Sequence, residues 1–232
     1  MLLVRKRKMT QYNTTHHNDR KDTNKELVDR IRASLNGIAS TFRSPQFIFP
    51  RLEKGDLVHG SILNGHWYAY QIDDPDIYRA LGDCYPTEAI PFKQIDEIFR
   101  SETESMYEEG LANLLRECQT REGTTIIPYS KAVERRNGCC LERSILFQLA
   151  AQARGEFDSY LIVGRLKIDD APYRYHAYNI IFTKGSRAFL VDTAWKKARL
   201  IEDIEFSPHG PRLKTLQLEP DAVSTDYLLN GM

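Results

Sequence analysis

The feature that most constrains the fold is a change of hydrophobic pattern at Gly155. Over residues 140–153, apolar side chains recur every four positions, which is the spacing of one face of a buried helix. A glycine directly after such a pattern is typical of a helix C-terminus, because its backbone readily adopts the left-handed conformation found there. The sequence therefore predicts a helix that ends at Gly155, with an inner face formed by Leu141, Ile145, Leu149 and Ala153.

Extended segments follow this helix. Their β-branched and aromatic residues are typical of strands. The tripeptide Lys184-Gly185-Ser186 has the composition of a turn and joins two of these segments, so we expect those two strands to pair antiparallel. A helix followed by an antiparallel sheet is an α+β arrangement, which is the fold class that the sequence predicts. The segments cover residues 160–166, 173–183 and 188–192, with 198–202 as an additional candidate.

The first half of the chain carries shorter signals. Asn64-Gly65 stands between two β-rich runs and predicts a hairpin over residues 57–72. Thr23 and Glu26 have the spacing of a capping box, which predicts a helix over residues 24–40. Further helical patterns cover residues 93–121, with a break near 101–105, and residues 129–136.

The composition excludes several classes of function. The 232 residues include 32 Lys and Arg and 32 Asp and Glu, so the formal net charge is zero, whereas nucleic-acid-binding chains usually have a basic excess. The sequence has no run of about 18 apolar residues that would predict a membrane span. Basic residues 5–8 follow only the short apolar stretch Leu2-Leu3-Val4, the reverse of a secretory signal. We therefore expect a cytoplasmic protein without a nucleic-acid partner, although a signal-free export route would leave no mark; the sequence carries no signal for an oligomeric state.

Four cysteines are candidates for chemistry, namely Cys84, Cys118, Cys139 and Cys140. None of them forms a C-x-x-C pair, so the sequence predicts no thiolate zinc site. A chain of this size without a secretory signal does not need disulfides, so we expect free thiols. We accordingly expect no metal and no cofactor.

Cys140 stands at the predicted start of the helix, where a thiol ionises most easily. The free N–H groups and partial positive charge of a helix N-terminus favour a thiolate, and the same N–H groups can hold an oxyanion. A thiolate nucleophile also needs a base and an acceptor that orients the base. His176 lies within one predicted strand and Asp192 ends the next, so antiparallel pairing makes them neighbours. Cys140, His176 and Asp192 are therefore the candidate catalytic residues.

Three stretches around these residues resemble the transglutaminase-like branch of the papain-like cysteine enzymes. The family patterns are Gly-x-Cys with an acidic residue shortly after and a small residue four positions later, then His-Ala-Trp, then Asp-Pro-Thr-Trp. Here Tyr178 stands in place of the tryptophan, and Thr193 follows the aspartate without a proline. The resemblance covers about residues 124–200. The stretches are Arg136-Asn137-Gly138-Cys139-Cys140-Leu141-Glu142-Arg143-Ser144, His176-Ala177-Tyr178-Asn179 and Leu190-Val191-Asp192-Thr193-Ala194-Trp195.

The resemblance implies a papain-like, transglutaminase-like core in which the nucleophile helix packs on an antiparallel β-sheet. It also implies that Cys140 is the nucleophile, that His176 is the general base and that Asp192 orients the imidazole. We accordingly divide the chain into a flexible polar N-terminal segment (1–22), a region of helices and a hairpin of unknown role (23–120), a catalytic core (121–205) and a C-terminal tail (206–232).

The register of the first stretch favours Cys140 over its neighbour. With Cys140 as the nucleophile, Gly138, Glu142 and Ser144 fall on the positions of the family pattern. Cys139 remains the alternative nucleophile.

The reaction implied by these residues is acyl transfer from a protein or peptide amide through a thioester. With water as the acceptor, the protein is a protease, an amidase or a glutamine deamidase. That cysteine-dependent hydrolase is the function we expect, and the organisation of the chain also fits a bacterial effector. With an amine as the acceptor, it is a transglutaminase or is similar to arylamine N-acetyltransferases, which resemble residues 135–142 but carry their cysteine nearer the N-terminus. A catalytically silent binding module is the third hypothesis.

Overall fold

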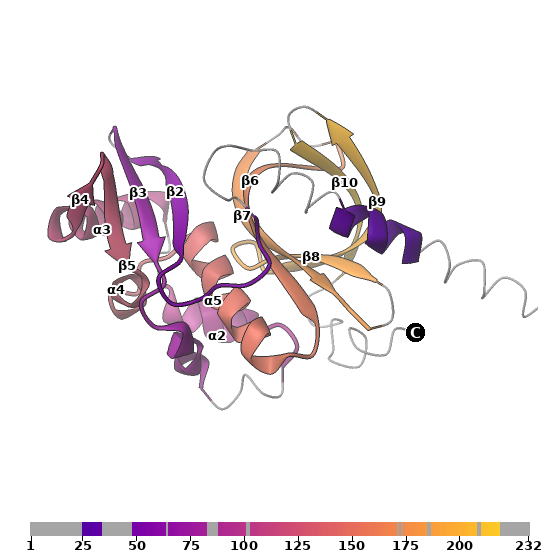
Figure 1. Ribbon diagram of the computed structural model, residues 1–232, viewed down its shortest axis with the longest axis horizontal. Coiled ribbons are helices and arrows are strands. Elements are labelled where there is room, and N and C mark those ends of the chain that lie inside the picture. The colour runs from indigo at the N-terminus through magenta and orange to yellow at the C-terminus, as the bar shows by residue number, and fades with distance from the viewer. Residues whose placement is uncertain are drawn as a thin grey trace, which may run out of the picture.

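Helix α5 (Cys140–Arg154) lies between two β-sheets in the computed structural model of the protein (Figure 1). On one side of α5, five strands close into a barrel, and on the other side lies a four-stranded sheet. The protein thus belongs to the α+β class, and its sheets are mainly antiparallel. The structure describes residues 25–33, 48–63, 65–82, 88–100, 103–170, 172, 174–184, 187–207 and 210–218.

Helix α5 ends where the sequence predicts. Gly155 adopts the left-handed conformation, with φ 66° and ψ 15°, and donates its N–H to the carbonyl of Ala151 at 3.1 Å. The predicted inner face is buried except at Ala153, which is exposed in the last turn. All residues from Leu141 to Ala151 are buried, because a sheet lies on each side of the helix.

The barrel follows α5 in the chain. Its neighbouring strands pair antiparallel, except that the last strand pairs parallel with the first, and pairing of the first two strands closes the ring. The antiparallel pairing predicted on either side of residues 184–186 is confirmed. A two-residue strand, β1 (Ile48–Phe49), adds to the edge of the first strand. The barrel strands are β6 (Asp158–Ile168), β7 (Arg174–Phe182), β8 (Ala188–Asp192), β9 (Lys197–Ser207) and β10 (Gly210–Leu218).

Strand β10 corrects the sequence-based division of the chain. Residues 206–232 were assigned to a tail, but residues 210–218 pair with β9 along their whole length and with β6 at two positions. The local sequence does not predict this strand. A glycine and a proline stand at its start, and its apolar pattern is weak, since Leu213 is buried while Leu216 is exposed. Its conformation depends on closing the barrel, which no local pattern indicates.

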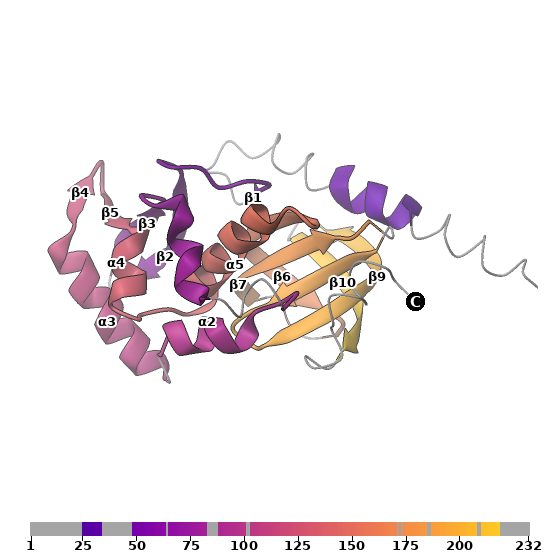
Figure 2. The ribbon, with the colours of Figure 1, turned by 90° about the horizontal axis from the view of Figure 1, so that it is seen from below.

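Two hydrophobic clusters fill the molecule. Side chains alternate along β7, so Tyr178 and Ile180 point into the barrel while Ala177 and Ile181 point towards α5. The helix over residues 25–33 adds Val28 and Ile31 to the barrel cluster. Its Arg32 lies over the Phe182 ring, with the guanidinium carbon 4.7 Å from the ring centroid, and pairs with Asp158 at 2.6 Å. This helix therefore packs against one end of the barrel, far from the four-stranded sheet (Figure 2).

The four-stranded sheet contains the predicted hairpin. Strands β2 (Leu57–Leu63) and β3 (His66–Gln71) pair antiparallel, and β3 then pairs parallel with β5. The helical pattern over residues 93–121 forms two helices separated near the predicted break, but its last three residues form β4 instead. The remaining elements are η1 (Pro75–Leu81), α2 (Phe92–Ile98), α3 (Glu104–Glu117), β4 (Gln119–Arg121), β5 (Thr124–Pro128) and α4 (Tyr129–Glu134).

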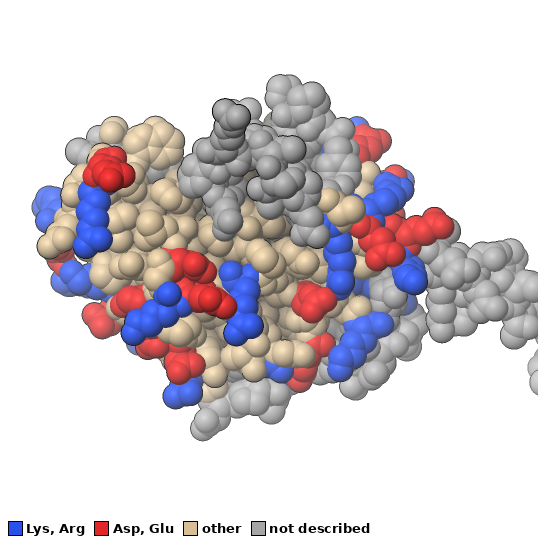
Figure 3. All heavy atoms as spheres, viewed as in Figure 1, with Lys and Arg blue, Asp and Glu red and all other residues tan. Residues whose placement is uncertain are grey.

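Several sequence-based expectations fall on residues that the structure does not describe. The segment 1–22, residues 34–40 of the predicted N-terminal helix, and Cys84 lie outside the described residues. Within the described part of the chain, no helix has both the length and the apolar character needed to cross a membrane. On the face shown in Figure 3, acidic and basic side chains are interspersed.

Candidate functional site

The structure brings His176 and Asp192 together, as the antiparallel pairing of their strands predicts. The Nε2 atom of His176 lies 2.7 Å from Oδ2 of Asp192, and both side chains are buried. The second carboxylate oxygen, Oδ1, accepts the backbone N–H groups of Ala194 and Trp195, each at 3.0 Å. The turn after β8 therefore fixes the carboxylate, and the carboxylate fixes the imidazole.

The imidazole is held from a second side by Trp195. The two rings are stacked, with centroids 4.7 Å apart and planes 20° apart. Because Asp192 occupies Nε2, the nitrogen that remains to take a proton from a thiol is Nδ1. The tryptophan shields one face of the ring from water and leaves its own outer face exposed.

Cys140 is the first residue of α5, and the packing of that helix on β7 determines where its thiol lies. The Ser144 hydroxyl donates to the Ala177 carbonyl at 3.1 Å, and the Asn179 amide donates to Oε1 of Gln148 at 3.2 Å. These contacts show that α5 and β7 run in the same direction. Four residues of helix and two residues of strand both advance by about 6 Å. One turn before Ser144, Cys140 therefore lies beside the beginning of β7.

The thiols of Cys139 and Cys140 ionise as a pair. Cys139 is exposed and Cys140 is half-buried. A hydrogen bond between the two thiols lowers the pKa of Cys139 and raises the pKa of Cys140 well above its ordinary value, and burial adds to the rise at Cys140. The N–H of Ala177 opposes that rise, and the charge of His176 contributes to the lowered pKa of Cys139. One proton therefore leaves the pair readily and the second with difficulty.

Contacts with His176 do not show which of the two thiols is the nucleophile. Within the described residues, no hydrogen bond joins either thiol to the imidazole of His176. The N–H of Ala177, which acts on Cys140, belongs to the peptide bond that directly follows His176. Both sulfurs thus lie at the start of α5, near the His176–Asp192 pair.

Glu142 lies beneath the thiol pair, and its contacts were not foreseen. Its carboxylate accepts hydrogen bonds from the hydroxyls of Tyr70 at 2.6 Å and Tyr107 at 2.9 Å, and from the N–H of Cys139 at 2.8 Å. The sequence indicated Glu142 only as part of the family resemblance. The two tyrosines are 72 and 35 positions away in the chain, so no local pattern could connect them to this site.

The loop before the thiols is packed against Phe99, the residue that follows α2. A methyl group on Gly138 would lie 2.3 Å from the ring of Phe99, so only glycine allows this approach. Arg143 donates to the Phe99 carbonyl at 2.7 Å and pairs with Asp96, which also pairs with Lys196 from the turn after β8. Asp96 thus links the start of α5 to the loop that follows Asp192.

Two further aromatic residues, Tyr129 and Trp67, occupy contrasting positions. Tyr129 is buried, and its hydroxyl donates to the carbonyl of Glu142 at 2.6 Å. Trp67 is exposed on β3. The hydroxyl of Tyr129 is therefore committed to the N-terminal turn of α5.

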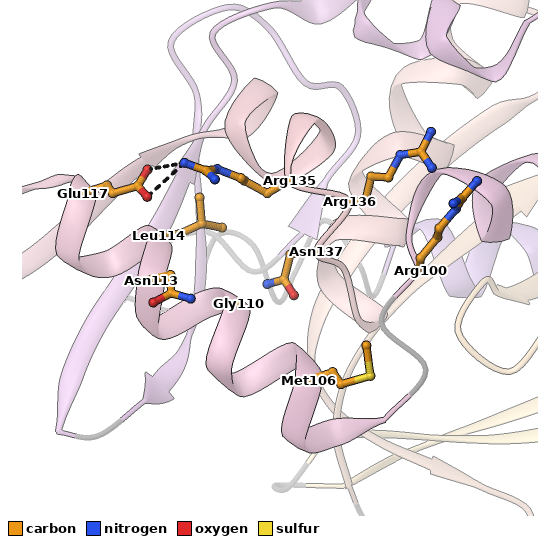
Figure 4. A pocket seen from close by; sticks show the side chains of 9 residues that line it. All are labelled: Arg100, Met106, Gly110, Asn113, Leu114, Glu117, Arg135, Arg136 and Asn137. Carbon is orange, nitrogen blue, oxygen red and sulfur yellow. Dashed lines mark hydrogen bonds and ion pairs between the residues drawn. The ribbon is translucent and has the colours of Figure 1, made fainter.

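A separate hollow of about 320 Å³ lies between α3 and the segment 135–137 that leads to the thiols (Figure 4). Arg135 pairs across it with Glu117 at 3.0 Å, while Arg100 and Arg136 extend together at its far end. The candidate catalytic residues do not line this hollow. Its lining consists of Arg100, Met106, Gly110, Asn113, Leu114, Glu117, Arg135, Arg136 and Asn137.

The described residues contain no group of three or more His, Cys, Asp or Glu side chains arranged to hold a metal ion. The described cysteines, Cys118, Cys139 and Cys140, are free. Comparison of the chain with family models, curated proteins and solved structures gave no match. The geometry of the site is therefore what indicates a function.

Proposed function

We propose that the protein is a cysteine-dependent hydrolase of protein or peptide amides, with Cys140, His176 and Asp192 as its catalytic residues. The observation that carries the proposal is the buried His176–Asp192 pair beside two thiols at the N-terminus of α5. A histidine whose partner nitrogen is fixed by a carboxylate is the base that thiol catalysis requires. The helix packed beside an antiparallel barrel is consistent with a papain-like, transglutaminase-like core.

The reaction proceeds through a thioester. His176 takes the thiol proton of Cys140 on Nδ1, the sulfur bonds to the amide carbon, and the imidazolium returns the proton to the departing amine or ammonia. Water then attacks the thioester and gives a proton to His176. The carbon–sulfur bond breaks, the proton returns to sulfur, and a carboxylic acid leaves. Asp192 holds the N–H of Nε2 throughout and stabilises the imidazolium.

The start of α5 supplies the electrostatic part of the site. The free N–H groups of its first turn point out of the helix, and their partial positive charge stabilises both a thiolate and the oxyanion of the intermediate. The N–H of Cys139 is committed to Glu142, so the donors for an oxyanion begin with the N–H of Cys140. The proposed chemistry needs reduced thiols, which the cytoplasm maintains, so a cytoplasmic location is part of the proposal.

The proposal is tested by the pH dependence of alkylation with iodoacetamide, read by mass spectrometry in wild type and in His176→Ala. The Cys139 thiol and burial raise the pKa of Cys140. The proposal requires the imidazolium of His176 to outweigh that rise, so we expect Cys140 to react well below about pH 8.5, the value of an ordinary thiol, and to lose that reactivity in the variant. Cys118 is an internal control, because burial raises its pKa and His176 is not one of the groups acting on it. A Cys140 that reacts like an ordinary thiol in both proteins contradicts the proposal.

The acceptor is then identified with a glutamine-containing peptide. Release of ammonia without incorporation of an added primary amine indicates a deamidase, and cleavage of the chain indicates a protease. Incorporation of the amine indicates an acyltransferase. Trapping of Cys139 in place of Cys140 by a peptide chloromethyl ketone would move the nucleophile by one residue.

A further inference from the structure

A buried carboxylate lies beneath the thiols and takes no part in the steps above. Glu142 is 0% exposed. Tyr70 reaches it from β3, Tyr107 from α3, and the N–H of Cys139 from the residue that caps α5. Three donors from separate parts of the chain therefore converge on one carboxylate.

Such an arrangement is not what helix capping alone requires. An acidic residue in the first turn stabilises a helix from an exposed position, without losing its hydration. A fully buried carboxylate is costly unless its oxygens are satisfied by hydrogen bonds. The tyrosine hydroxyls satisfy Oε1 of Glu142, and the peptide N–H of Cys139 satisfies Oε2. Burial raises the pKa of the Glu142 carboxyl, and the hydrogen bonds from Tyr70, Cys139 and Tyr107 oppose that rise. The fold thus surrounds this carboxylate with the donors that its charged form needs.

We propose that Glu142 is a positioning residue for the thiol pair, which fixes the peptide plane between Gly138 and Cys139 and keeps a negative charge beside both sulfurs. The inference rests on the proposed thiol chemistry and deepens it. Glu142 acts through Cys139 and Cys140 and touches no substrate.

The peptide geometry is the first part of this role. Because the Cys139 N–H is bound to Glu142, the backbone is held at the point where α5 begins. Tyr129 holds the same turn from α4 through the Glu142 carbonyl. The next N–H, that of Cys140, therefore has a fixed direction, as an oxyanion donor must.

The charge is the second part. The negative charge of Glu142 raises the pKa of Cys140 and opposes the lowering of the pKa of Cys139. The groups that face the carboxylate are neutral tyrosines, since burial raises the pKa of Tyr70, Tyr107 and Tyr129. The charge of Glu142 therefore opposes ionisation of both thiols, whereas the charge of His176 favours ionisation of Cys139.

The surroundings contain few other charges that could produce this effect. The Tyr68 hydroxyl, from β3, lies 3.3 Å from the hydroxyl of Tyr107, which is one of the donors to the carboxylate. The neighbouring Arg143 is paired with Asp96 and bound to the Phe99 carbonyl. His176, from β7, acts on Cys139 in the opposite direction to Glu142. Besides the hydrogen bond between the thiols and their burial, the charges of Glu142 and His176 thus act on the pKa of Cys139 in opposite directions, and the charge of Glu142 also acts on Cys140.

The test is alkylation of Glu142→Gln by iodoacetamide over a range of pH. A glutamine can keep all three contacts, because its oxygen can accept the Cys139 N–H and its amide can donate to the two phenol oxygens. Trypsin cleaves at Arg136 and Arg143, and fragment ions of the peptide 137–143 separate the two cysteines. We expect the midpoint for Cys140 to fall by about one pH unit, the size of effect that a neighbouring charge produces.

Two further variants make the result specific. Glu109→Gln removes the same charge from an exposed position on α3 and is expected to leave the midpoint unchanged. Tyr107→Phe removes one donor, weakens the charged form of Glu142 and is expected to shift the midpoint part of the way towards the Glu142→Gln value. It also carries the test if Glu142→Gln does not fold.

The outcomes separate this inference from the proposed function. A folded Glu142→Gln with a wild-type midpoint, together with an unshifted Tyr107→Phe, overturns the positioning role while a His176-dependent thiol keeps the hydrolase proposal. If the pH dependence of thiol alkylation is the same in wild type and in His176→Ala, the hydrolase proposal is overturned. In that case, a shift in Glu142→Gln but not in Glu109→Gln still shows that the buried charge controls the thiols.

Discussion

Gly138 shows how a single residue shapes the site. Its Cα lies against the Phe99 ring, and any side chain would collide with that ring. We expect Gly138→Ala to lower the free energy of unfolding by about 1–3 kcal/mol, the usual effect of overpacking a buried contact. Urea denaturation measures this change.

The substitution also reports on the position of the thiols. Because Phe99 belongs to the loop after α2, the collision must move either that loop or the peptide before Cys139. The double variant Gly138→Ala with Phe99→Leu provides the matched control, since a smaller side chain leaves room for the methyl group. If Gly138→Ala unfolds with the wild-type free energy, the close approach does not limit this position.

At the scale of single residues, the sequence predicted the candidate catalytic residues but not the residues that hold them in position. Asp192 and His176 were expected to be neighbours because a short turn joins their strands, and their side chains meet at 2.7 Å. The tyrosines around Glu142 were missed, because they come from β3 and α3 and are placed only by tertiary packing. Choosing between Cys139 and Cys140 needs the environment of each thiol, which residue order does not determine.

Among the elements, α5 positions the thiols at its N-terminus, and its stability depends on the glycine that ends it. Gly155 has a φ of 66°, where a Cβ is strained. We expect Gly155→Ala to lower the free energy of unfolding by about 1 kcal/mol. The thiols lie at the other end of the helix, so the pH midpoint for alkylation of Cys140 should not move. Loss of stability together with a shifted midpoint would show that the two ends of α5 are coupled.

The elements that the sequence predicted are those with a strong local pattern. The helix ending at Gly155 and the hairpin at Asn64-Gly65 follow from apolar spacing and turn chemistry, and both are present. Strand β4 has three exposed residues, and β10 alternates too weakly to be recognised. Both are strands because a neighbouring strand offers unpaired backbone groups, which is a property of the assembled sheet.

On the scale of the whole molecule, buried tyrosines in the barrel and around α5 make the free energy of unfolding depend on pH. Tyr178 points into the barrel, whereas Tyr70 and Tyr129 lie in the cluster around α5, and burial raises the pKa of all three. Above about pH 10, tyrosines ionise in the unfolded chain but stay protonated in the folded protein. The unfolded state then binds fewer protons, so the free energy of unfolding falls as pH rises.

The variant Tyr178→Phe measures how much the barrel tyrosine contributes to the alkaline decline in the free energy of unfolding. The Tyr178 hydroxyl is buried without a hydrogen-bond partner among the described residues, so its removal should raise the free energy of unfolding at pH 7 by about 1 kcal/mol. The alkaline decline should become shallower by about 1.4 kcal/mol per pH unit, the contribution of one group. Tyr129→Phe is the matched control, because it loses the 2.6 Å bond to Glu142 and should be less stable at pH 7. Equal destabilisation in both variants, measured by urea denaturation from pH 7 to 11, would mean that the barrel interior satisfies the Tyr178 hydroxyl.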